Sequence, residues 1–333
     1  MRRLFFVLSV LTCLLLCGCA DNNTEEYSKT IFAMDTVMDL KIYSSNGDDV
    51  LTQAENEIKR IENLLDRGNE NSEIYKINQN KSDVVSEETA TVITNALSVS
   101  KETGGAFDIT IAPIIDLWGF YGNNFRVPSD TELQAALENV GYEKVQLDGS
   151  NISIPDNTLI DLGGIGKGYT SDMLAKLLRE NDITSAIISL GGNVQTIGKK
   201  PDGSLWTVGV ADPRDTSKHI GKLKISDKAV VTSGGYQRYF ERDGVTYHHI
   251  INPDTGKSAE SGLASVTIIS ESGTRADGLS TALFVMGLEK SIELWRRSND
   301  FDAIFVDDNG KMFITEGIKD NFESANNYEI IKK

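Results

Sequence analysis

One segment of the chain combines glycines with a lysine in a pattern that suits an anionic ligand. It reads Asp161-Leu-Gly-Gly-Ile-Gly-Lys-Gly-Tyr169 and leads into a predicted helix. Glycines let a ligand approach the backbone closely, and the free N–H groups of a helix N-terminus favour anions. The segment is neither a Walker loop, because Gly168 stands where a Ser or Thr would hold magnesium, nor a G-x-G-x-x-G loop, because Tyr169 replaces the third glycine. A phosphate-bearing ligand and a tight structural turn both remain compatible with it.

Two of the three histidines are adjacent in the chain. They lie in the segment Tyr247-His-His-Ile-Ile-Asn-Pro-Asp-Thr-Gly256. Neighbouring residues of a strand point to opposite faces, so His248 and His249 should not enter one site, and a two-histidine zinc site is not expected. One histidine could act as a catalytic acid or base, since imidazole titrates near neutral pH. A structural role is the more common one for a single histidine, so both roles stay open.

A third segment offers oxygen ligands for a hard cation. It reads Thr274-Arg-Ala-Asp-Gly-Leu-Ser-Thr-Ala-Leu-Phe284. Asp277 and Thr281 are four residues apart on a predicted helix and therefore share one face. A carboxylate and a hydroxyl are the kinds of ligand that magnesium takes. The alternative is an aspartate that merely stabilises the first turn of the helix through the helix dipole.

Four further segments end in glycines or polar turns and are weak signals individually. They are Met34-Asp-Thr36, Gly104-Gly-Ala-Phe-Asp108, Ser189-Leu-Gly-Gly-Asn193 and Ser233-Gly-Gly-Tyr236. Several glycine-rich turns could converge on one extended ligand, although simple hairpin turns would look the same.

Hydrophobic periodicity predicts the elements that must position these segments. Helices are predicted at residues 49–67, 87–103, 129–141, 169–180, 274–286 and 289–297. Strands are predicted at 31–43, around 145, 152 and 160, at 186–190, 206–210, 223–225, 230–232, 246–251 and 264–270, and in a closing hairpin of 303–306 and 312–315. Strands and helices do not alternate regularly, so the expected fold class is α+β, with layered mixed β-sheets flanked by helices.

Composition excludes several classes of protein. The chain has 333 residues, 33 Lys and Arg against 49 Asp and Glu, a net charge of −16, and 40% hydrophobic residues. Such an acidic chain is a poor nucleic-acid binder, and its apolar content argues against intrinsic disorder. All three cysteines, Cys13, Cys17 and Cys19, lie in the first nineteen residues. The folded body therefore has no cysteine for a disulfide framework, a thiolate metal site or thiol catalysis.

The N-terminus is typical of a bacterial lipoprotein signal. Arg2 and Arg3 precede an apolar run, Leu4–Leu16, which is too short to span a bilayer comfortably. The run ends in Leu16-Cys17-Gly18-Cys19. We expect residues 1–18 to be a signal peptide, Cys19 to be the lipidated N-terminus, and residues 19–29 to be a tether. Residues 30–320 are then expected to form one domain, possibly of two intimate subdomains, followed by a C-terminal tail at 321–333. An ordinary cleaved signal or an uncleaved anchor is the alternative.

Taken in order, these motifs resemble the ApbE-type FAD:protein FMN transferase family. The matching strings are MDT, GGAFD, DLGGIGKGY, SLGGN, SGGYQRYF, HHIINPDTG and TRADGLSTALFVMG, and they cover residues from about 31 to about 315. The resemblance implies a T-fold-like architecture with a flavin site in a central cleft. Two departures matter: Asn252 replaces a frequent aspartate, and Gly164 replaces a hydroxyl residue found in some members, so that its metal contact would be main-chain only.

The resemblance also implies residue roles. The implied flavin contacts are Met34, Ala106, Phe107, Asp108, Asp161, Lys167 and Ile251. The implied metal positions are Gly164, Asp277, Ser280 and Thr281. His249 matches the histidine that assists the transfer, and Asp277 is a second catalytic candidate, although a metal-bound carboxylate is a poor base.

The implied reaction is Mg²⁺-dependent transfer of FMN from FAD to a Ser or Thr hydroxyl of an acceptor protein, with release of AMP. The implied partners are FAD, an extracytoplasmic or membrane redox protein with an S/T-G-A-S/T site, and, through the lipid anchor, the extracytoplasmic face of the bacterial membrane. Two alternatives remain: an FAD pyrophosphatase that releases FMN and AMP, and a flavin-binding lipoprotein without catalytic activity. The chain contains no S/T-G-A-S/T string of its own, which argues against its being the flavinylated carrier.

Overall fold

The computed structural model describes residues 25–333 and confirms the α+β class. The helices are α1 (Gly47–Leu65), α2 (Glu73–Asn80), α3 (Glu87–Glu102), α4 (Ala112–Trp118), α5 (Asp130–Leu137), α6 (Gly166–Glu180), α7 (Gly273–Met286) and α8 (Leu288–Arg297), with short 3-10 turns η1 (Tyr121–Asn123), η2 (Tyr142–Lys144) and η3 (Glu316–Ile318). The strands are β1 (Glu25–Ala33), β2 (Thr36–Ser44), β3 (Ser82–Val84), β4 (Gln146–Asp148), β5 (Asn151–Ser153), β6 (Ser185–Leu190), β7 (Asn193–Gly198), β8 (Trp206–Asp212), β9 (Asp215–Ile225), β10 (Ala229–Gly234), β11 (Tyr239–Arg242), β12 (Val245–His248), β13 (Leu263–Ser270), β14 (Phe301–Asp307), β15 (Met312–Thr315), β16 (Phe322–Glu323) and β17 (Tyr328–Ile331).

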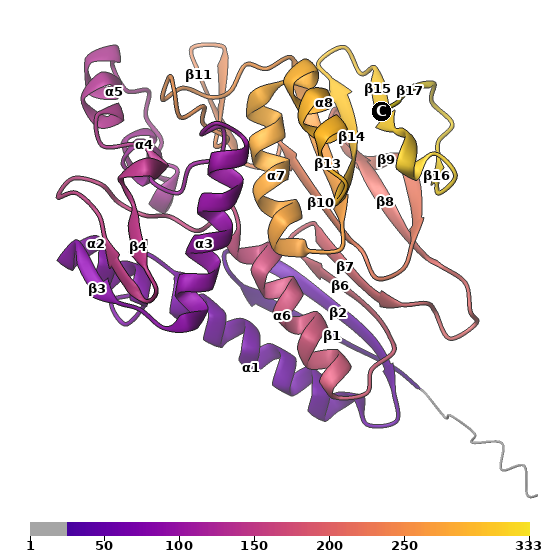
Figure 1. Cartoon of the computed structure of the whole chain (residues 1–333). Helices are drawn as coiled ribbons and strands as arrows, with labels where there is room; N and C mark the ends of the chain where they lie inside the picture. The colour runs from indigo at the N-terminus through magenta and orange to yellow at the C-terminus, as the bar shows by residue number, and fades with distance from the viewer. Residues whose placement is uncertain (1–24) are drawn as a thin grey trace, which may run out of the picture.

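A nine-stranded sheet forms the centre of the fold. Its strands run in the order β1-β2-β6-β7-β10-β13-β14-β15-β17, and every neighbouring pair is antiparallel except β15 with β17. Helices α6 and α7 lie against one face of this sheet, and α1 follows its β1–β2 end (Figure 1). This face carries the two helix N-termini on which the predicted site depends.

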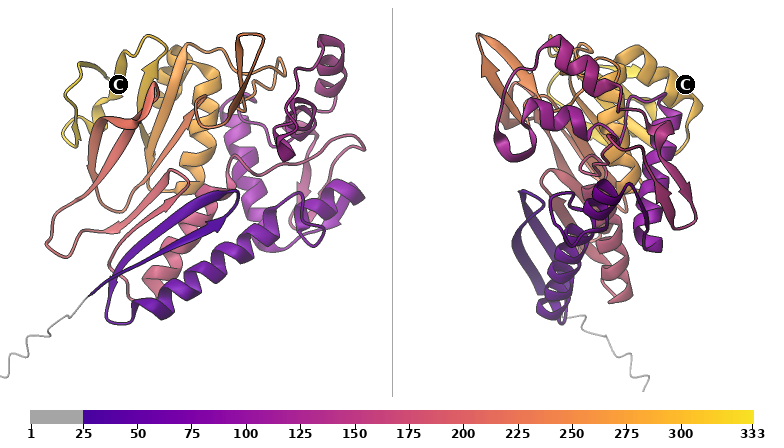
Figure 2. Two further views of the ribbon diagram at one scale, coloured as in Figure 1. Left: turned by 180° about the vertical axis from the view of Figure 1, so that it is seen from behind. Right: turned by 90° about the vertical axis from the view of Figure 1, so that its left-hand side faces the viewer.

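The opposite face is covered only in part. Along β14, Phe305 packs with the helices, whereas its neighbours Ile304 and Val306 pack against β8, β9 and β16. This alternation is the period of two that a strand buried on both faces requires. Seen from behind, β1 and β2 lie uncovered on that face (Figure 2), and their paired residues Phe32 and Val37 are 71% and 54% exposed.

The strand predicted at residues 31–43 was wrong in one respect. It is a hairpin, in which β1 and β2 pair through Ala33 and Thr36 around a two-residue turn. The turn residues, Met34 (φ 50°) and Asp35 (φ 57°), both have left-handed backbones. Such turns usually contain Asn, Asp or Gly, so Asp35 alone was a weak turn signal, and Met34 is an unusual residue at this position. The turn directs the predicted flavin contact Met34 toward α1 and α6.

A strand was also predicted around Ile160, and this was wrong. Ile160 lies in a loop, where the side-chain amide of Asn78 serves both of its backbone groups. The Ile160 N–H donates to Asn78 Oδ1 over 2.7 Å, and Asn78 Nδ2 donates to the Ile160 carbonyl over 2.8 Å. One buried asparagine therefore replaces a strand partner.

The ends of the described chain belong to the sheets. β1 begins at Glu25, inside the segment expected to be a tether, and β17 pairs with β15 inside the expected tail. Residues 1–24, with the predicted signal peptide and the predicted lipidation site Cys19, lie outside the described residues. Within residues 25–333, no helix has both the length and the apolar character needed to cross a membrane.

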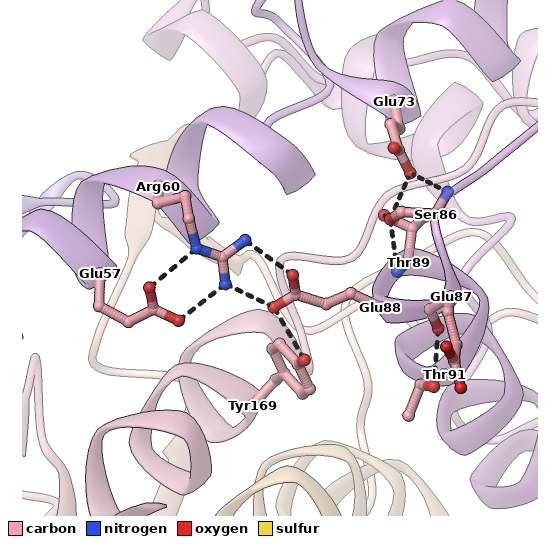
Figure 3. A network of polar contacts seen from close by, with 9 residues as sticks. All are labelled: Glu57, Arg60, Glu73, Ser86, Glu87, Glu88, Thr89, Thr91 and Tyr169. Carbon is pink, nitrogen blue, oxygen red and sulfur yellow. Dashed lines mark hydrogen bonds and ion pairs between the residues drawn. The ribbon is translucent and has the colours of Figure 1, made fainter. Parts of the chain in front are cut away.

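A network of charged residues fixes the start of α6 against α1 and α3 (Figure 3). Arg60 on α1 donates to both carboxylate oxygens of Glu57 and of Glu88, at 2.7 to 2.8 Å. Glu88 on α3 also accepts a bond of 2.9 Å from the hydroxyl of Tyr169. The tyrosine of the glycine-lysine segment is therefore a structural anchor that holds the N-terminus of α6 in place.

Candidate active site

The N-terminal turns of α6 and α7 cross closely at Gly168 and Gly273. A Cβ at Gly168 would lie 2.2 Å from the carbonyl oxygen of Gly273 and 2.6 Å from Cβ of Asp277. Asp172 on α6 fixes the crossing, since its carboxylate accepts from the N–H groups of Gly273 (2.7 Å) and Thr274 (2.9 Å). This contact brings the metal candidate on α7 to the glycine-lysine segment, more than a hundred residues earlier in the chain.

Asp277 is a buried carboxylate at this crossing. It is 4% exposed, and its Oδ2 accepts a 2.8 Å hydrogen bond from the N–H of Gly168. Burial raises its pKa, while the nearby charge of Lys167 and the Gly168 bond oppose that rise. The side-chain amide of Asn193 also lowers the pKa of Asp277. However, the buried Nδ2 of Asn193 has no hydrogen bond of good geometry among the described residues. A buried carboxylate that is only partly compensated favours a bound cation.

His249 is a second titratable group whose pKa is affected by the charge of Lys167. Burial lowers the pKa of His249 to about 4, with smaller contributions from the positive charges of Lys167 and Arg238. Its Nδ1 is 3.1 Å from the carbonyl oxygen of Arg238. Because a carbonyl only accepts, Nδ1 carries the hydrogen of the neutral ring, and Nε2 keeps a lone pair. Lys167 therefore lies close to both catalytic candidates.

The two adjacent histidines have different surroundings, as predicted, although the predicted strand 246–251 ends at His248 and His249 lies just beyond it. His248 Nε2 is 3.2 Å from the carbonyl of Ala259, and its ring packs edge-on against Phe284 at 5.6 Å. His249 instead packs edge-on against Phe120 at 6.5 Å. His248 thus belongs to the core beside α7, and His249 to the site.

Hydroxyl groups connect α7 with the end of β10. Ser233 Oγ lies 2.8 Å from Ser280 Oγ and 3.3 Å from Thr281 Oγ1. Ser280 is fully buried, and its hydroxyl also donates to the Asp277 carbonyl over 2.8 Å. Its hydroxyl is therefore held by protein partners, whereas Thr281, one residue further, is half-buried with one long contact. Of the two hydroxyls, that of Thr281 is the freer to bind a metal.

Met34, in the β1–β2 turn, contacts helices α1 and α6. Its N–H donates to Glu62 on α1 over 2.5 Å, and its sulfur accepts from Thr170 Oγ1 on α6 over 3.7 Å. Met34, one of the two left-handed residues of the turn, is thus bonded to both α1 and α6. Strained turns of this kind are typical of ligand sites, where the surrounding structure fixes them.

In the Gly104–Asp108 segment, Phe107 packs against the glycine loop and Asp108 hydrogen-bonds the neighbouring backbone. Phe107 is buried, and a Cβ on Gly164 would lie 2.9 Å from its ring, so a side chain at 164 would displace the ring. Asp108 is buried too, and its carboxylate accepts from Thr110 and from the Tyr142 N–H at 2.6 to 2.7 Å. Asp108 therefore orders this loop, and the half-buried Ala106 packs beside it against the core.

Asp161 has a partner that sequence reasoning missed. Arg67, just after α1, donates from Nε to Asp161 Oδ2 over 2.8 Å and pairs through both Nη groups with Asp116. Asp161 Oδ1 accepts from the Gly163 N–H over 2.7 Å, which sets the start of the glycine turn. No sequence signal links Arg67 to this loop, because 94 residues separate the pair.

Ile251 lies in a separate apolar cluster below the histidine segment. It is 5% exposed and packs with Ile114, Trp118 and Phe120. The indole N–H of Trp118 donates to the Gly256 carbonyl over 2.7 Å, which ties the 251–256 turn to α4. The cluster therefore supports the His249 side of the site.

The donor set suits magnesium better than a transition metal. No group of three or more His, Cys, Asp or Glu side chains converges anywhere in residues 25–333. A single buried carboxylate, a hydroxyl and main-chain carbonyls are hard oxygen ligands, and Mg²⁺ commonly takes one or two carboxylates together with substrate phosphates and water. The Gly164 carbonyl, Asp277 and Thr281 thus fit the predicted cation.

A cavity of about 580 Å³ lies apart from these residues. Its walls come from β9, β13, the N-terminus of α7 and the segment around η3, and include Lys224, Arg275 and Asp300. The charged groups in it are paired with one another or with neighbours, as in the ion pair of Arg275 with Glu102 at 2.7 Å. None of the predicted site residues lines it.

The fold and the site define an α+β protein in which a lysine at the start of α6 lies beside a buried carboxylate of α7, with a histidine whose pKa that lysine affects, an arrangement suited to an anionic, phosphate-bearing ligand. A sequence model of the ApbE family matches residues 34–305. The chain belongs to the ApbE family.

Named relatives agree with this assignment. The chain is 34% identical over 322 residues to the FAD:protein FMN transferase of Klebsiella pneumoniae (strain 342), covering 94% of this chain and 98% of the relative. It is 31% identical to the FAD:protein FMN transferase of Treponema pallidum (strain Nichols), covering 95% of each.

Solved structures are similar as well. The crystal structure of the ApbE protein of Thermotoga maritima superposes with a TM-score of 0.83 at 36% identity, covering 89% of this chain and 98% of that one. The flavin transferase ApbE of Vibrio cholerae superposes with a TM-score of 0.81 at 29% identity, covering 90% and 99%.

Proposed function

We propose that this protein is an FAD:protein FMN transferase and that it uses Mg²⁺ to transfer FMN to a Ser or Thr hydroxyl of an acceptor protein. The observation that carries the proposal is the contact of buried Asp277 with the N-terminus of α6, beside Lys167. It supports the proposal because a carboxylate that can take a cation, next to a lysine, is what a diphosphate substrate needs.

The chain's own residues would bind the diphosphate and shield its charge. Lys167 would hold the phosphate oxygens in place through its charge and its hydrogen bonds. Asp277, Thr281 and the Gly164 carbonyl would hold Mg²⁺. When bound, the ion supplies positive charge to the phosphate oxygens and so lowers the barrier to attack at phosphorus.

His249 is the proposed base. In the neutral ring the Nδ1 hydrogen is bound to the Arg238 carbonyl, so Nε2 can take the proton of the acceptor hydroxyl. The hydroxyl oxygen then bonds to the FMN phosphorus, the bond from that phosphorus to the AMP oxygen breaks, and AMP leaves. Because burial holds its pKa at about 4, His249 is neutral at pH 7 and available as an acceptor.

The acceptor protein and the cellular location are further parts of the proposal. The S/T-G-A-S/T type of site on an extracytoplasmic or membrane redox protein would supply the hydroxyl. Lipidation at Cys19 would hold the enzyme at the extracytoplasmic face of the membrane. Replacing Cys19 with Ala should move the protein from the membrane fraction to the soluble fraction without altering transfer in solution; unchanged fractionation would contradict the anchor.

A mass measurement separates the proposal from its alternatives. The full chain is incubated with FAD, Mg²⁺ and a protein carrying an S/T-G-A-S/T site, and the intact mass of the acceptor is followed together with free FMN. An acceptor heavier by one FMN phosphoester, which chelation of Mg²⁺ prevents, is expected. Free FMN and AMP without an adduct would indicate the pyrophosphatase, and unchanged FAD would indicate a binding protein.

A further inference from the structure

Tyr121 is a partly exposed aromatic residue near the site. It is 46% exposed and begins the η1 turn. The preceding residue, Phe120, is buried and packs edge-on against His249. On its other side, Tyr121 contacts Arg67, the partner of Asp161. The ring therefore contacts the arginine that holds the glycine loop and directly follows, in the chain, the residue that packs against the histidine.

One face of the ring is covered by a fixed cation. The guanidinium carbon of Arg67 lies 3.9 Å from the centre of the Tyr121 ring. Arg67 itself is held by Asp116 (2.5 and 3.1 Å) and Asp161 (2.8 Å), and its side chain is 8% exposed. A planar guanidinium stacked on an aromatic face is a favourable contact. The ring is thus held in one orientation before any ligand arrives.

The edge of the ring is fixed by a glycine. A Cβ on Gly68 would lie 1.7 Å from the Tyr121 hydroxyl oxygen and 3.1 Å from Cζ, so the hydroxyl occupies the space of a missing side chain. The backbone of Gly68 does not have a positive φ, so space rather than conformation requires glycine there. Arg238 completes the clamp by donating to the Phe120 carbonyl and to Asn123.

We infer that Tyr121, backed by Arg67, is a stacking platform for a planar ring of the substrate dinucleotide. The inference rests on the proposed function, because that function supplies a ligand with two planar rings, the isoalloxazine and the adenine. A ring held in place before binding loses little freedom when a second ring stacks on its open face. Stacking of a base on an aromatic side chain contributes about 1–3 kcal/mol, which corresponds to a change in Kd of about 5- to 150-fold.

The test is equilibrium binding of FAD to the full-length wild type and five variants, in the presence of Mg²⁺. Tyr121→Leu keeps an apolar side chain but removes the aromatic face, and should weaken binding about tenfold or more. Tyr121→Phe keeps the face and should stay within about twofold of wild type. Tyr328→Ala is the matched control, because it removes a half-buried tyrosine on β17, at the far end of the sheet (Figure 1). Thermal melting confirms that each variant is folded.

Gly68→Ala tests the same ring without altering Tyr121. The new Cβ must push the hydroxyl away, so FAD affinity should fall. Adding Tyr121→Phe removes the clashing oxygen and should restore part of the affinity. Titrations with FMN and with AMP then identify which ring stacks, since only that half-ligand should lose affinity in Tyr121→Leu.

Two outcomes would overturn the platform. One is FAD binding by Tyr121→Leu within twofold of wild type. The other is equal weakening by Tyr121→Phe and Tyr121→Leu, which would assign the effect to the hydroxyl. A wild-type protein that binds no FAD would instead contradict the proposed function, so the two failures are distinguishable.

Discussion

The N–H of Gly168 donates a 2.8 Å hydrogen bond to the carboxylate of Asp277, and this bond joins the two helix N-termini of the site. It is possible only because the helices cross at glycines, with the Gly273 carbonyl 2.2 Å from where a Cβ of residue 168 would lie. The packing of α6 on α7 and the placing of the metal candidate are therefore one structural feature.

Replacing Asp277 with Asn should abolish most FMN transfer. The amide keeps the shape of the side chain but lacks the charge that would bind Mg²⁺, and we expect a loss of about 100-fold or more in kcat. The rate of acceptor flavinylation measures this. Glu289→Ala, which removes an exposed carboxylate at the start of α8, is the control and should leave the rate unchanged. Equal rates in D277N and wild type would contradict the role of Asp277.

Mg²⁺ should stabilise the wild-type protein but not the Asp277→Asn variant. A ligand that binds only the folded state stabilises it in proportion to RT ln(1 + [L]/Kd), about 2.7 kcal/mol at one hundred times Kd. Melting temperatures with and without Mg²⁺ test this in the absence of FAD. Without the ion, the variant should be at least as stable as wild type, because burial disfavours the charged carboxylate that the substitution removes. An equal Mg²⁺ shift in both proteins would place the cation elsewhere.

His249 should make stability depend on pH in a defined window. Burial lowers its pKa in the folded state from 6.5 to about 4, so between these values the unfolded chain binds more protons. The contribution of the neutral ring to the unfolding free energy is therefore complete above pH 6.5 and is lost as pH falls toward 4, by up to about 3 kcal/mol.

Urea unfolding at pH 7 and pH 5 measures this difference. His249→Gln should reduce the loss of stability between the two values, whereas His219→Gln, on an exposed part of β9, should not. The same low pKa predicts that the histidine does not limit transfer until well below pH 6. An acidic limb of the rate profile centred near 6.5, and absent in His249→Gln, would contradict the assignment.

Two glycines of α6 should respond in opposite ways to alanine. At Gly168 a Cβ meets the backbone of Gly273, so α6 and α7 must separate, at a cost of about 1–3 kcal/mol in stability. At Gly166 the nearest atom to a new Cβ is 4.0 Å away, and alanine should be neutral or should stabilise by about 0.5–1 kcal/mol. Unfolding free energies of the two variants test the pair; similar values would contradict the close crossing.

Local patterns determined much of this protein. The stripe of apolar residues predicted α1, and the glycines after residue 103 predicted the end of α3. Ser129 and Glu132 form a capping box at the start of α5, as the spacing of these residue types predicts, although α5 ends at Leu137 before the predicted Gly141. These elements could be predicted because each depends on residues within a few positions of one another. The motif order was equally informative, since it identified the family before any packing was known.

Tertiary contacts decided the rest. The β1–β2 turn had only a weak local signal in Asp35, and the left-handed backbone of Met34 is accompanied by contacts with α1 and α6 that the sequence does not show. Arg67, which orders Asp161 and supports Tyr121, is invisible in the sequence because its partners are 49 and 94 residues away. The sequence by itself thus determined which residues could bind phosphate and a cation. Only the folded chain decided that Asp277 meets the segment of Lys167, because that contact depends on a glycine crossing between helices distant in the sequence.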